Sequence, residues 1–173
     1  MSKIPVMLHI RGTQNYQEQD PDVIELTTEG TMEREKEVWV LTYEESDLTG
    51  LAGVTTCFRV GPRGVVLKRT GNIENQMIFM EGRKHESLYR LDFGALMLTV
   101  KATKVESNVT ENGGTVDIHY NIEIEDTNAG MVEYHIVVSP CCPRYKSPKG
   151  FSIYAKRSIC AMHSICPAGR EGI

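Results

Sequence analysis

The sequence predicts an all-β fold: a single antiparallel up-and-down β-barrel of about eight to ten strands, followed by an irregular C-terminal tail. From Val116 to Ile124, apolar and polar residues alternate, as in a strand with one buried and one solvated face. The same alternation recurs along most of the first 138 residues, and no helical period competes with it. Short turn signals separate the alternating runs, as consecutive hairpins require.

About ten such runs follow one another along the chain. They cover residues 6–11, 24–32, 39–43, 55–60, 65–69, 77–79, 89–93, 96–102, 116–124 and 132–138. Short hairpins in series form a meander, and a long meander removes its exposed edges by closing on itself. A two-sheet sandwich is the alternative, but it usually needs longer crossing connections than this chain shows.

Four local features predict irregularities within this pattern. Gly30 inside an apolar run predicts a bend or bulge. The apolar phase shifts at Val105, which predicts another bulge. Asn-Gly-Gly at residues 112–114 predicts a two-residue hairpin turn, and residues 127–130 predict the turn before the last strand.

Charge is distributed unevenly along the chain, whose formal net charge is −4. Residues 1–138 carry 13 Lys and Arg against 22 Asp and Glu, whereas residues 139–173 carry 6 against 1. An acidic body repels phosphate backbones, so we expect the barrel not to bind nucleic acid. We therefore expect a barrel domain over residues 1–138 and a basic, cysteine- and proline-containing tail over residues 139–173 that is disordered or loosely attached.

The hydropathy of the sequence predicts where in the cell the protein is located. The N-terminal residues lack a long apolar run, and no stretch is long enough to span a bilayer. We therefore expect no signal peptide, no membrane association and a cytoplasmic location, where thiols stay reduced. The oligomeric state leaves no signal in the sequence.

Several short motifs occur in a fixed order along the chain. They are Tyr43-Glu44-Glu45 with Leu48 and Gly50, residues 65–71 (VVLKRTG), Phe79 with Gly82, Tyr89 before Phe93-Gly94, Leu96 with Leu98, and Ile118 with Tyr120. Together they resemble the YwiB-like, calycin-like β-barrel family of small bacterial proteins, from about residue 4 to about residue 138. The resemblance implies a lipocalin-like barrel in a bacterial cytoplasm, and it brings no catalytic residues and no substrate with it.

Arg69 is the single residue that most strongly suggests a binding function. It alternates in phase with Val65 and Leu67, so its side chain should point into the barrel. A buried guanidinium must be paired, because an isolated buried charge is very unfavourable. Glu45, which is in phase with Tyr43, could supply the partner.

The inward-facing polar and aromatic residues predict a ligand-binding set. Its members are Arg69, Tyr43, Glu45, Tyr89, Tyr120 and Trp39. An apolar lumen with one arginine and a few phenols suits a small molecule that carries a carboxylate or a phosphate. The alternative is that Arg69 packs over Trp39 or pairs with Glu45 and only closes one end of the barrel.

Other reactive side chains predict little chemistry. Glu44 and Glu45 are adjacent on a strand and face opposite sides, so they cannot flank one substrate atom. His119 and His135 lie on neighbouring strands without a third ligand. Cys141, Cys142, Cys160, His163 and Cys166 make zinc conceivable in the tail, but their spacing is not that of a recognised finger. We therefore expect no catalytic residues, no metal and no cofactor.

Two non-enzymatic functions fit these observations, and an enzyme on the barrel is a third hypothesis, which requires a titratable group with a strongly shifted pKa in a cleft. The first is a non-enzymatic small-molecule binding protein that holds its ligand in the barrel lumen. The alternative is a structural or protein-interaction module with a filled lumen that acts through its acidic outer surface. Lumen volume discriminates between them, because a lumen packed by side chains leaves no room for a guest.

Overall fold

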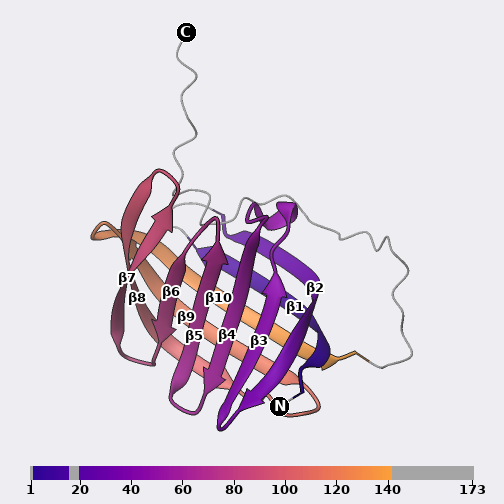
Figure 1. The fold of residues 1–173 in the computed structure, drawn as a ribbon. Coiled ribbons are helices and arrows are strands. Elements are labelled where there is room, and N and C mark those ends of the chain that lie inside the picture. The colour runs from indigo at the N-terminus through magenta and orange to yellow at the C-terminus, as the bar shows by residue number, and fades with distance from the viewer. Residues whose placement is uncertain (1, 16–19, 142–173) are drawn as a thin grey trace.

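The computed structural model describes residues 2–15 and 20–141, which form ten antiparallel strands in one sheet that curls into a nearly closed barrel (Figure 1). The strands are β1 (Ile4–Asn15), β2 (Asp22–Glu35), β3 (Val38–Glu44), β4 (Val54–Gly61), β5 (Gly64–Gly71), β6 (Asn75–Phe79), β7 (Lys84–Leu91), β8 (Gly94–Ser107), β9 (Gly114–Ile124) and β10 (Thr127–Pro140). A one-turn 3-10 helix, η1 (Asp47–Thr49), lies between β3 and β4. The predicted all-β antiparallel barrel is confirmed.

The order of the strands places the seam of the barrel between β6 and β7 rather than between the first and last strands. The strand order is β6-β5-β4-β3-β2-β1-β10-β9-β8-β7, so the first and last strands pair. Across the seam between β6 and β7, the described residues form one backbone bridge, in which Glu74 and Arg90 exchange hydrogen bonds of 3.2 and 2.9 Å. β10 continues to Pro140, two residues beyond the predicted end of the barrel domain.

No helix in the described part of the chain is long and apolar enough to cross a bilayer. Residues 142–173, which include most of the predicted tail, lie outside the described residues.

Inward side chains of β3 to β6 form three layers along the barrel axis. The lower layer, at the end where the N-terminus lies in Figure 1, is Trp39, Val60, Val65 and Phe79. The middle layer is Leu41, Phe58, Leu67 and Met77. The upper layer, at the end of η1, is Tyr43, Thr56, Arg69 and Asn75. Two layers are apolar and only the upper one is polar, so the strand register itself places the polar chemistry at the upper end.

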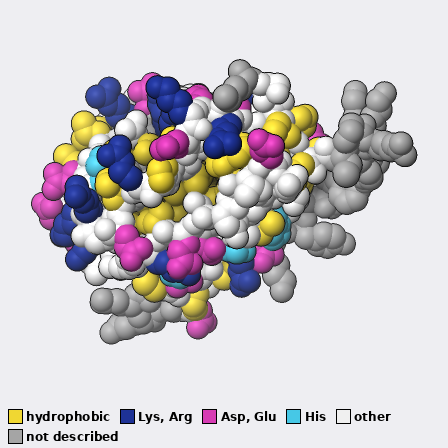
Figure 2. Space-filling model, turned by 90° about the horizontal axis from the view of Figure 1, so that it is seen from below, with side chains coloured by type: hydrophobic (Ala, Val, Ile, Leu, Met, Phe, Trp, Pro, Cys, Tyr) yellow, Lys and Arg dark blue, Asp and Glu magenta, His cyan; other side chains and the backbone are white. Residues whose placement is uncertain are grey.

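The lower end of the barrel is apolar at its centre. Hydrophobic side chains are visible in the middle of this face, with acidic and basic side chains intermixed around them (Figure 2). Trp39 belongs to this end and is half-buried, and the guanidinium carbon of Arg34 lies 5.5 Å from the centroid of its ring. This cation–π contact replaces the predicted alternative in which Arg69 packs over Trp39, which is therefore wrong.

A bulge is present at one of the two positions where the sequence pattern allows one. The register between β8 and β9 shifts between Ala102 and Lys104, where the apolar phase changes. At Gly30 the register runs on without a shift. A Cβ there would lie 2.6 Å from the carbonyl oxygen of Thr42, so this glycine permits a close approach of two backbones rather than a bulge.

The turn before the last strand lies earlier than predicted. Glu125 (φ 48°) and Asp126 (φ 62°) form its left-handed centre. The Glu125 N–H donates to the Met97 carbonyl at 3.0 Å, and the Glu125 carboxylate accepts from the Met97 N–H at 2.7 Å. These bonds to β8 hold a turn that contains no glycine. The expected turn segment belongs instead to β10, where the register shifts between Asn128 and Gly130.

The connection between β8 and β9 is longer than the predicted two-residue turn. Thr110 and Gly113 form an isolated bridge inside it. The positive φ angles in this connection belong to Gly113 (92°) and Gly114 (147°). Glycine dominates the sites that need positive φ, so the left-handed positions follow the two glycines.

Candidate functional site

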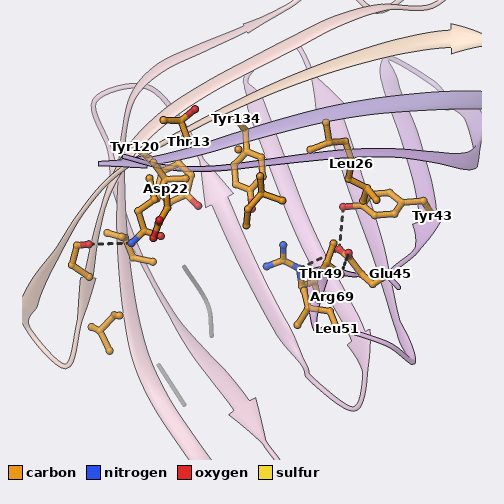
Figure 3. A pocket seen from close by; sticks show the side chains of 18 residues that line it. Thr13, Asp22, Leu26, Tyr43, Glu45, Thr49, Leu51, Arg69, Tyr120 and Tyr134 are labelled. Atoms are coloured by element: carbon orange, nitrogen blue, oxygen red, sulfur yellow. Dashed lines mark hydrogen bonds and ion pairs between the residues drawn. The ribbon is translucent and has the colours of Figure 1, made fainter. Parts of the chain in front are cut away.

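A cavity of about 70 Å³ lies at the upper end of the barrel, where β1, β2, β5, β9, β10 and the β3–β4 connection converge (Figure 3). Its apolar wall consists of Ile10, Ile24, Leu26, Leu51, Ile122, Ile124 and Val132. A cavity of about 150 Å³ accommodates benzene, so this one encloses only a few non-hydrogen atoms. A larger molecule would have to project out of it.

The carboxylate of Glu45 is the centre of the polar layer and accepts three hydroxyl hydrogen bonds. Tyr43 Oη donates to Glu45 Oε1 at 3.0 Å, and Thr56 Oγ1 donates to the same oxygen at 2.6 Å. Thr49 Oγ1 donates to Glu45 Oε2 at 2.9 Å. Arg69 Nε lies 3.9 Å from Glu45 Oε1, with both side chains almost fully buried. The carboxylate is therefore compensated on every side, as a buried charge requires.

Strand register and one loop bring these groups together. Tyr43, Thr56 and Arg69 are neighbours across β3, β4 and β5. Thr49 is the last residue of η1, and it is followed by Gly50 in a left-handed conformation (φ 68°). This short turn of helix brings the Thr49 hydroxyl back to the carboxylate that precedes it by four residues.

The guanidinium of Arg69 extends past Glu45 into the cavity. Figure 3 shows its terminal nitrogens directed away from Glu45, toward the side where Tyr134 and Tyr120 lie. The two phenol rings are stacked, with centroids 6.3 Å apart and an interplanar angle of 10°. Phe79 contacts Tyr120 from the core, at 4.7 Å between centroids. A planar guanidinium that faces an apolar cavity lined by aromatic rings can bind a carboxylate through two parallel hydrogen bonds.

The opposite side of the cavity carries acceptors. Gln14 is 5% exposed, and its Nε2 donates to the Ala129 carbonyl at 3.3 Å. Its Oε1 is buried without a hydrogen-bond partner in the described structure. Asp22 is the cross-strand neighbour of Gln14, and Figure 3 shows it near Tyr120, across the cavity from Arg69. The described lining residues include two acidic side chains, Asp22 and Glu45, and one basic side chain, Arg69. The described lining therefore carries one net negative charge.

Tyr43 is a lining residue with a perturbed pKa. Burial raises the pKa of its phenol well above the ordinary value of 10.0. The adjacent Glu45 carboxylate raises the pKa further, because a second negative charge would form beside it, while Arg69 acts in the opposite direction. Tyr43 therefore stays a neutral hydrogen-bond donor far into the alkaline range.

This pKa shift predicts a loss of stability above the ordinary phenol pKa of 10.0. The folded state keeps the Tyr43 proton where the unfolded chain loses it, so the stabilisation is complete below that pH and declines as the pH rises further. We expect Tyr43→Phe to show a shallower alkaline decline in the free energy of unfolding, measured by urea titration. At neutral pH the variant should lose about 1–2 kcal/mol through its missing hydrogen bond. Equal alkaline slopes in both proteins would contradict the assignment.

Four of the six residues predicted from the sequence line this cavity and two do not. Tyr43, Glu45, Arg69 and Tyr120 lie around it. Tyr89 is buried in the core on β7, and Trp39 lies in the lower layer. Alternation tells which face of a strand a residue occupies, but not its height along the barrel axis. Of the two partners considered for Arg69, the structure shows Glu45.

Sequence reasoning missed several lining residues. Tyr134 alternates in phase with Val132 and Ile136, so the rule that found Tyr120 would also have found it. Gln14 and Asp22 become neighbours only through the pairing of β1 with β2. Thr49 carries no periodic signal, because it lies in a connection rather than a strand.

The remaining candidate residues lie outside this cavity. Glu44 is exposed and accepts from Thr55 Oγ1 at 2.8 Å, on the face opposite Glu45. His135 Nδ1 lies 2.7 Å from Asp117 on the outer surface, rather than next to His119. No three His, Cys, Asp or Glu side chains among the described residues are grouped so that they could hold a metal ion. Cys142, Cys160, His163 and Cys166 lie outside the described residues.

Comparison with known proteins now decides the family. The profile of the family described as "Domain of unknown function (DUF1934)" matches residues 8–136. The chain belongs to this family. The match runs from β1 to β10, so the DUF1934 domain is the barrel itself.

One bacterial protein is similar to this chain both in sequence and in its crystal structure. The "Uncharacterized beta-barrel protein YwiB" of Bacillus subtilis (strain 168) is 27% identical over 123 residues, which cover 70% of this chain and 84% of that protein. The crystal structure of the ywiB protein from Bacillus subtilis has a TM-score of 0.70 at 23% sequence identity, and the match covers 81% of this chain and 94% of that chain. The structural likeness shows a shared fold. The predicted resemblance to the YwiB-like family is confirmed.

Proposed function

We propose that this DUF1934 protein is a non-enzymatic binding protein for a small molecule with a carboxylate group. The ligand occupies the cavity at the upper end of the barrel, with its carboxylate on Arg69. One observation carries this proposal: a buried guanidinium, held on one side by Glu45, extends its terminal nitrogens into a mostly apolar cavity (Figure 3). Building such a site costs desolvation energy, and an anionic ligand would offset part of that cost.

Cavity size and charge favour a carboxylate over a phosphate. The space of about 70 Å³ suits a group of a few atoms. The described lining already carries one net negative charge, from Asp22 and Glu45 against Arg69. A phosphate ester carries close to two negative charges at neutral pH, so it would meet stronger repulsion here than a carboxylate would.

The surroundings of Glu45 favour binding over catalysis. A general acid or base must exchange a proton with its substrate, and it must be within hydrogen-bond reach of it. Glu45 instead accepts from three hydroxyls of the protein and faces Arg69. This arrangement uses the carboxylate to orient the guanidinium.

A bacterial cytoplasm and a calycin-like manner of ligand binding are part of the same proposal. The curated relative is a bacterial protein. Cys57 and Cys141 are free thiols in the described structure, which suits a reducing compartment. The calycin-like comparison is supported by an antiparallel barrel with an end cavity between aromatic side chains.

A panel of small carboxylates, titrated into the isotope-labelled protein and followed by NMR, tests the proposal. A ligand of about five non-hydrogen atoms gains at most about 7 kcal/mol, so Kd values should lie in the micromolar to millimolar range. We expect saturable shifts of resonances around the cavity in the wild type. The variant Arg69→Met/Glu45→Gln removes both charges of the pair, and its affinity should fall by about tenfold or more.

Lys68→Met is the matched control, because Lys68 is exposed and adjacent to Arg69 on the opposite face of β5. It should bind as the wild type does. A panel that binds the double variant as tightly as the wild type would refute the role of Arg69. A panel with no saturable response would refute the ligand-binding function.

That second result would favour an interaction module with a filled lumen. Most side chains of the two lower layers are fully buried in one hydrophobic cluster, which supports this alternative. Its contact surface would then be the β7–β8 hairpin rather than the acidic outer surface expected from the sequence. In this hairpin Leu88 (46% exposed) and Met97 (37%) are cross-strand neighbours, and Phe93 (72%) lies at the tip. Apolar side chains gathered on a surface in this way are typical of contact sites.

A further inference from the structure

We infer that the ligand is a small amino acid, bound as a zwitterion with its ammonium group at Asp22 and Gln14 and its carboxylate at Arg69. This inference rests on the proposed function of the cavity and adds a second point of recognition to it. The cavity has a donor side and an acceptor side, and a zwitterion matches both.

Gln14 provides a buried acceptor that the described protein does not satisfy. The side chain lines the cavity and is 5% exposed. Its Nε2 is engaged with the Ala129 carbonyl, which fixes the orientation of the amide. Its Oε1 is left without a partner in the described structure. Buried acceptors are rarely left unsatisfied, so a donor from a ligand is the natural complement.

Asp22 places a negative charge beside this acceptor. Gln14 and Asp22 are directly opposite each other in the β1–β2 pairing. Opposite residues in an antiparallel pair have Cβ atoms about 5 Å apart, so one ammonium group can reach both side chains. Three N–H donors are available on an ammonium group, and neither the carboxylate nor the amide oxygen can donate to the other.

Charge balance selects a zwitterion over a simple anion. Glu45 already neutralises Arg69, so the described cavity lining retains the uncompensated charge of Asp22. A carboxylate alone would add to this negative charge, whereas a zwitterion adds none. Figure 3 shows Asp22 and Arg69 on opposite sides of the cavity, with the Tyr134 ring between them. The apolar wall and this ring would contact the short aliphatic part of the ligand.

Three ligands of similar length test the two recognition points separately. Propionate carries only the carboxylate, propylamine carries only the ammonium group, and β-alanine carries both. We expect β-alanine to bind the wild type about tenfold more tightly than propionate, because the ammonium forms charged hydrogen bonds. Asp22→Asn should remove this advantage and leave propionate binding unchanged or stronger. Glycine and γ-aminobutyrate extend the series, and the tightest of the three amino acids reports the spacing between the two sides.

The readout is saturable NMR shifts, because small zwitterions at high concentration stabilise proteins without a site. Asp20→Asn is the matched control, since Asp20 is exposed and does not line the cavity. Gln14→Leu provides a second variant with the same expected loss for β-alanine. Equal binding of propionate and β-alanine to the wild type, or an equal loss of both in Asp22→Asn, would overturn the inference and leave the carboxylate site in place. Failure of every ligand would overturn the proposed function as well.

Discussion

Replacing Arg69 with methionine is expected to lower the free energy of unfolding by about 3–5 kcal/mol. The arginine is 3% exposed and is paired with Glu45, which is also buried. Methionine is apolar and fills a similar space, but it leaves the carboxylate in the core without its cation. The penalty for an uncompensated buried charge dominates the loss. Urea unfolding near neutral pH measures it.

The double variant Arg69→Met/Glu45→Gln should be much closer to the wild type, because it removes both charges at once. Glutamine retains an acceptor for the hydroxyl groups of Tyr43, Thr49 and Thr56. A single variant as stable as the wild type would show that the ion pair is not needed for stability.

Gly71→Ala is expected to cost about 3–4 kcal/mol, from the sum of backbone strain and a steric clash. Gly71 has a φ of 128°, a conformation that side chains rarely permit. A Cβ at this position would overlap the carbonyl oxygen of Gly53 in the β3–β4 connection. Displacing that connection would also move Thr49 and Leu51 away from the cavity, so ligand affinity should fall together with stability.

Comparison with Gly94→Ala separates the stability lost through backbone strain from the stability lost through a steric clash. Gly94 also has a positive φ, of 154°, but a Cβ there would meet nothing within 4 Å. We expect a loss of only about 1–2 kcal/mol and unchanged ligand binding. Thermal and urea unfolding of both variants give the comparison. Equal losses at the two glycines would contradict the proposed contact between β5 and the β3–β4 connection.

Much of the barrel follows from local alternation. Alternation predicts that Val65, Leu67 and Arg69 share one face, because successive side chains of a strand point to opposite sides, and all three are buried. The bulge between Ala102 and Lys104 was visible as a phase shift in the same pattern. The turn at Glu125 and Asp126 was not visible, because hydrogen bonds to the distant residue Met97 stabilise it.

The candidate site shows where alternation stops being informative. Trp39, Leu41 and Tyr43 share one face of β3, yet they belong to three different layers of the barrel. Only the uppermost of them reaches the cavity. Height along the axis depends on how each strand is staggered against its neighbours, which is a property of pairing between strands.

The sequence by itself determined the fold class, the inward face of most strands and the burial of Arg69, because each depends on residues close together along the chain. Only the tertiary structure decided that Arg69 meets Glu45, and that Gln14 and Asp22 form an acceptor side across from it. Those relations join residues that are distant in sequence, and they arise from register and closure of the sheet. Strand pairing therefore determines which polar groups meet in the cavity, and a local sequence pattern carries no information about that pairing.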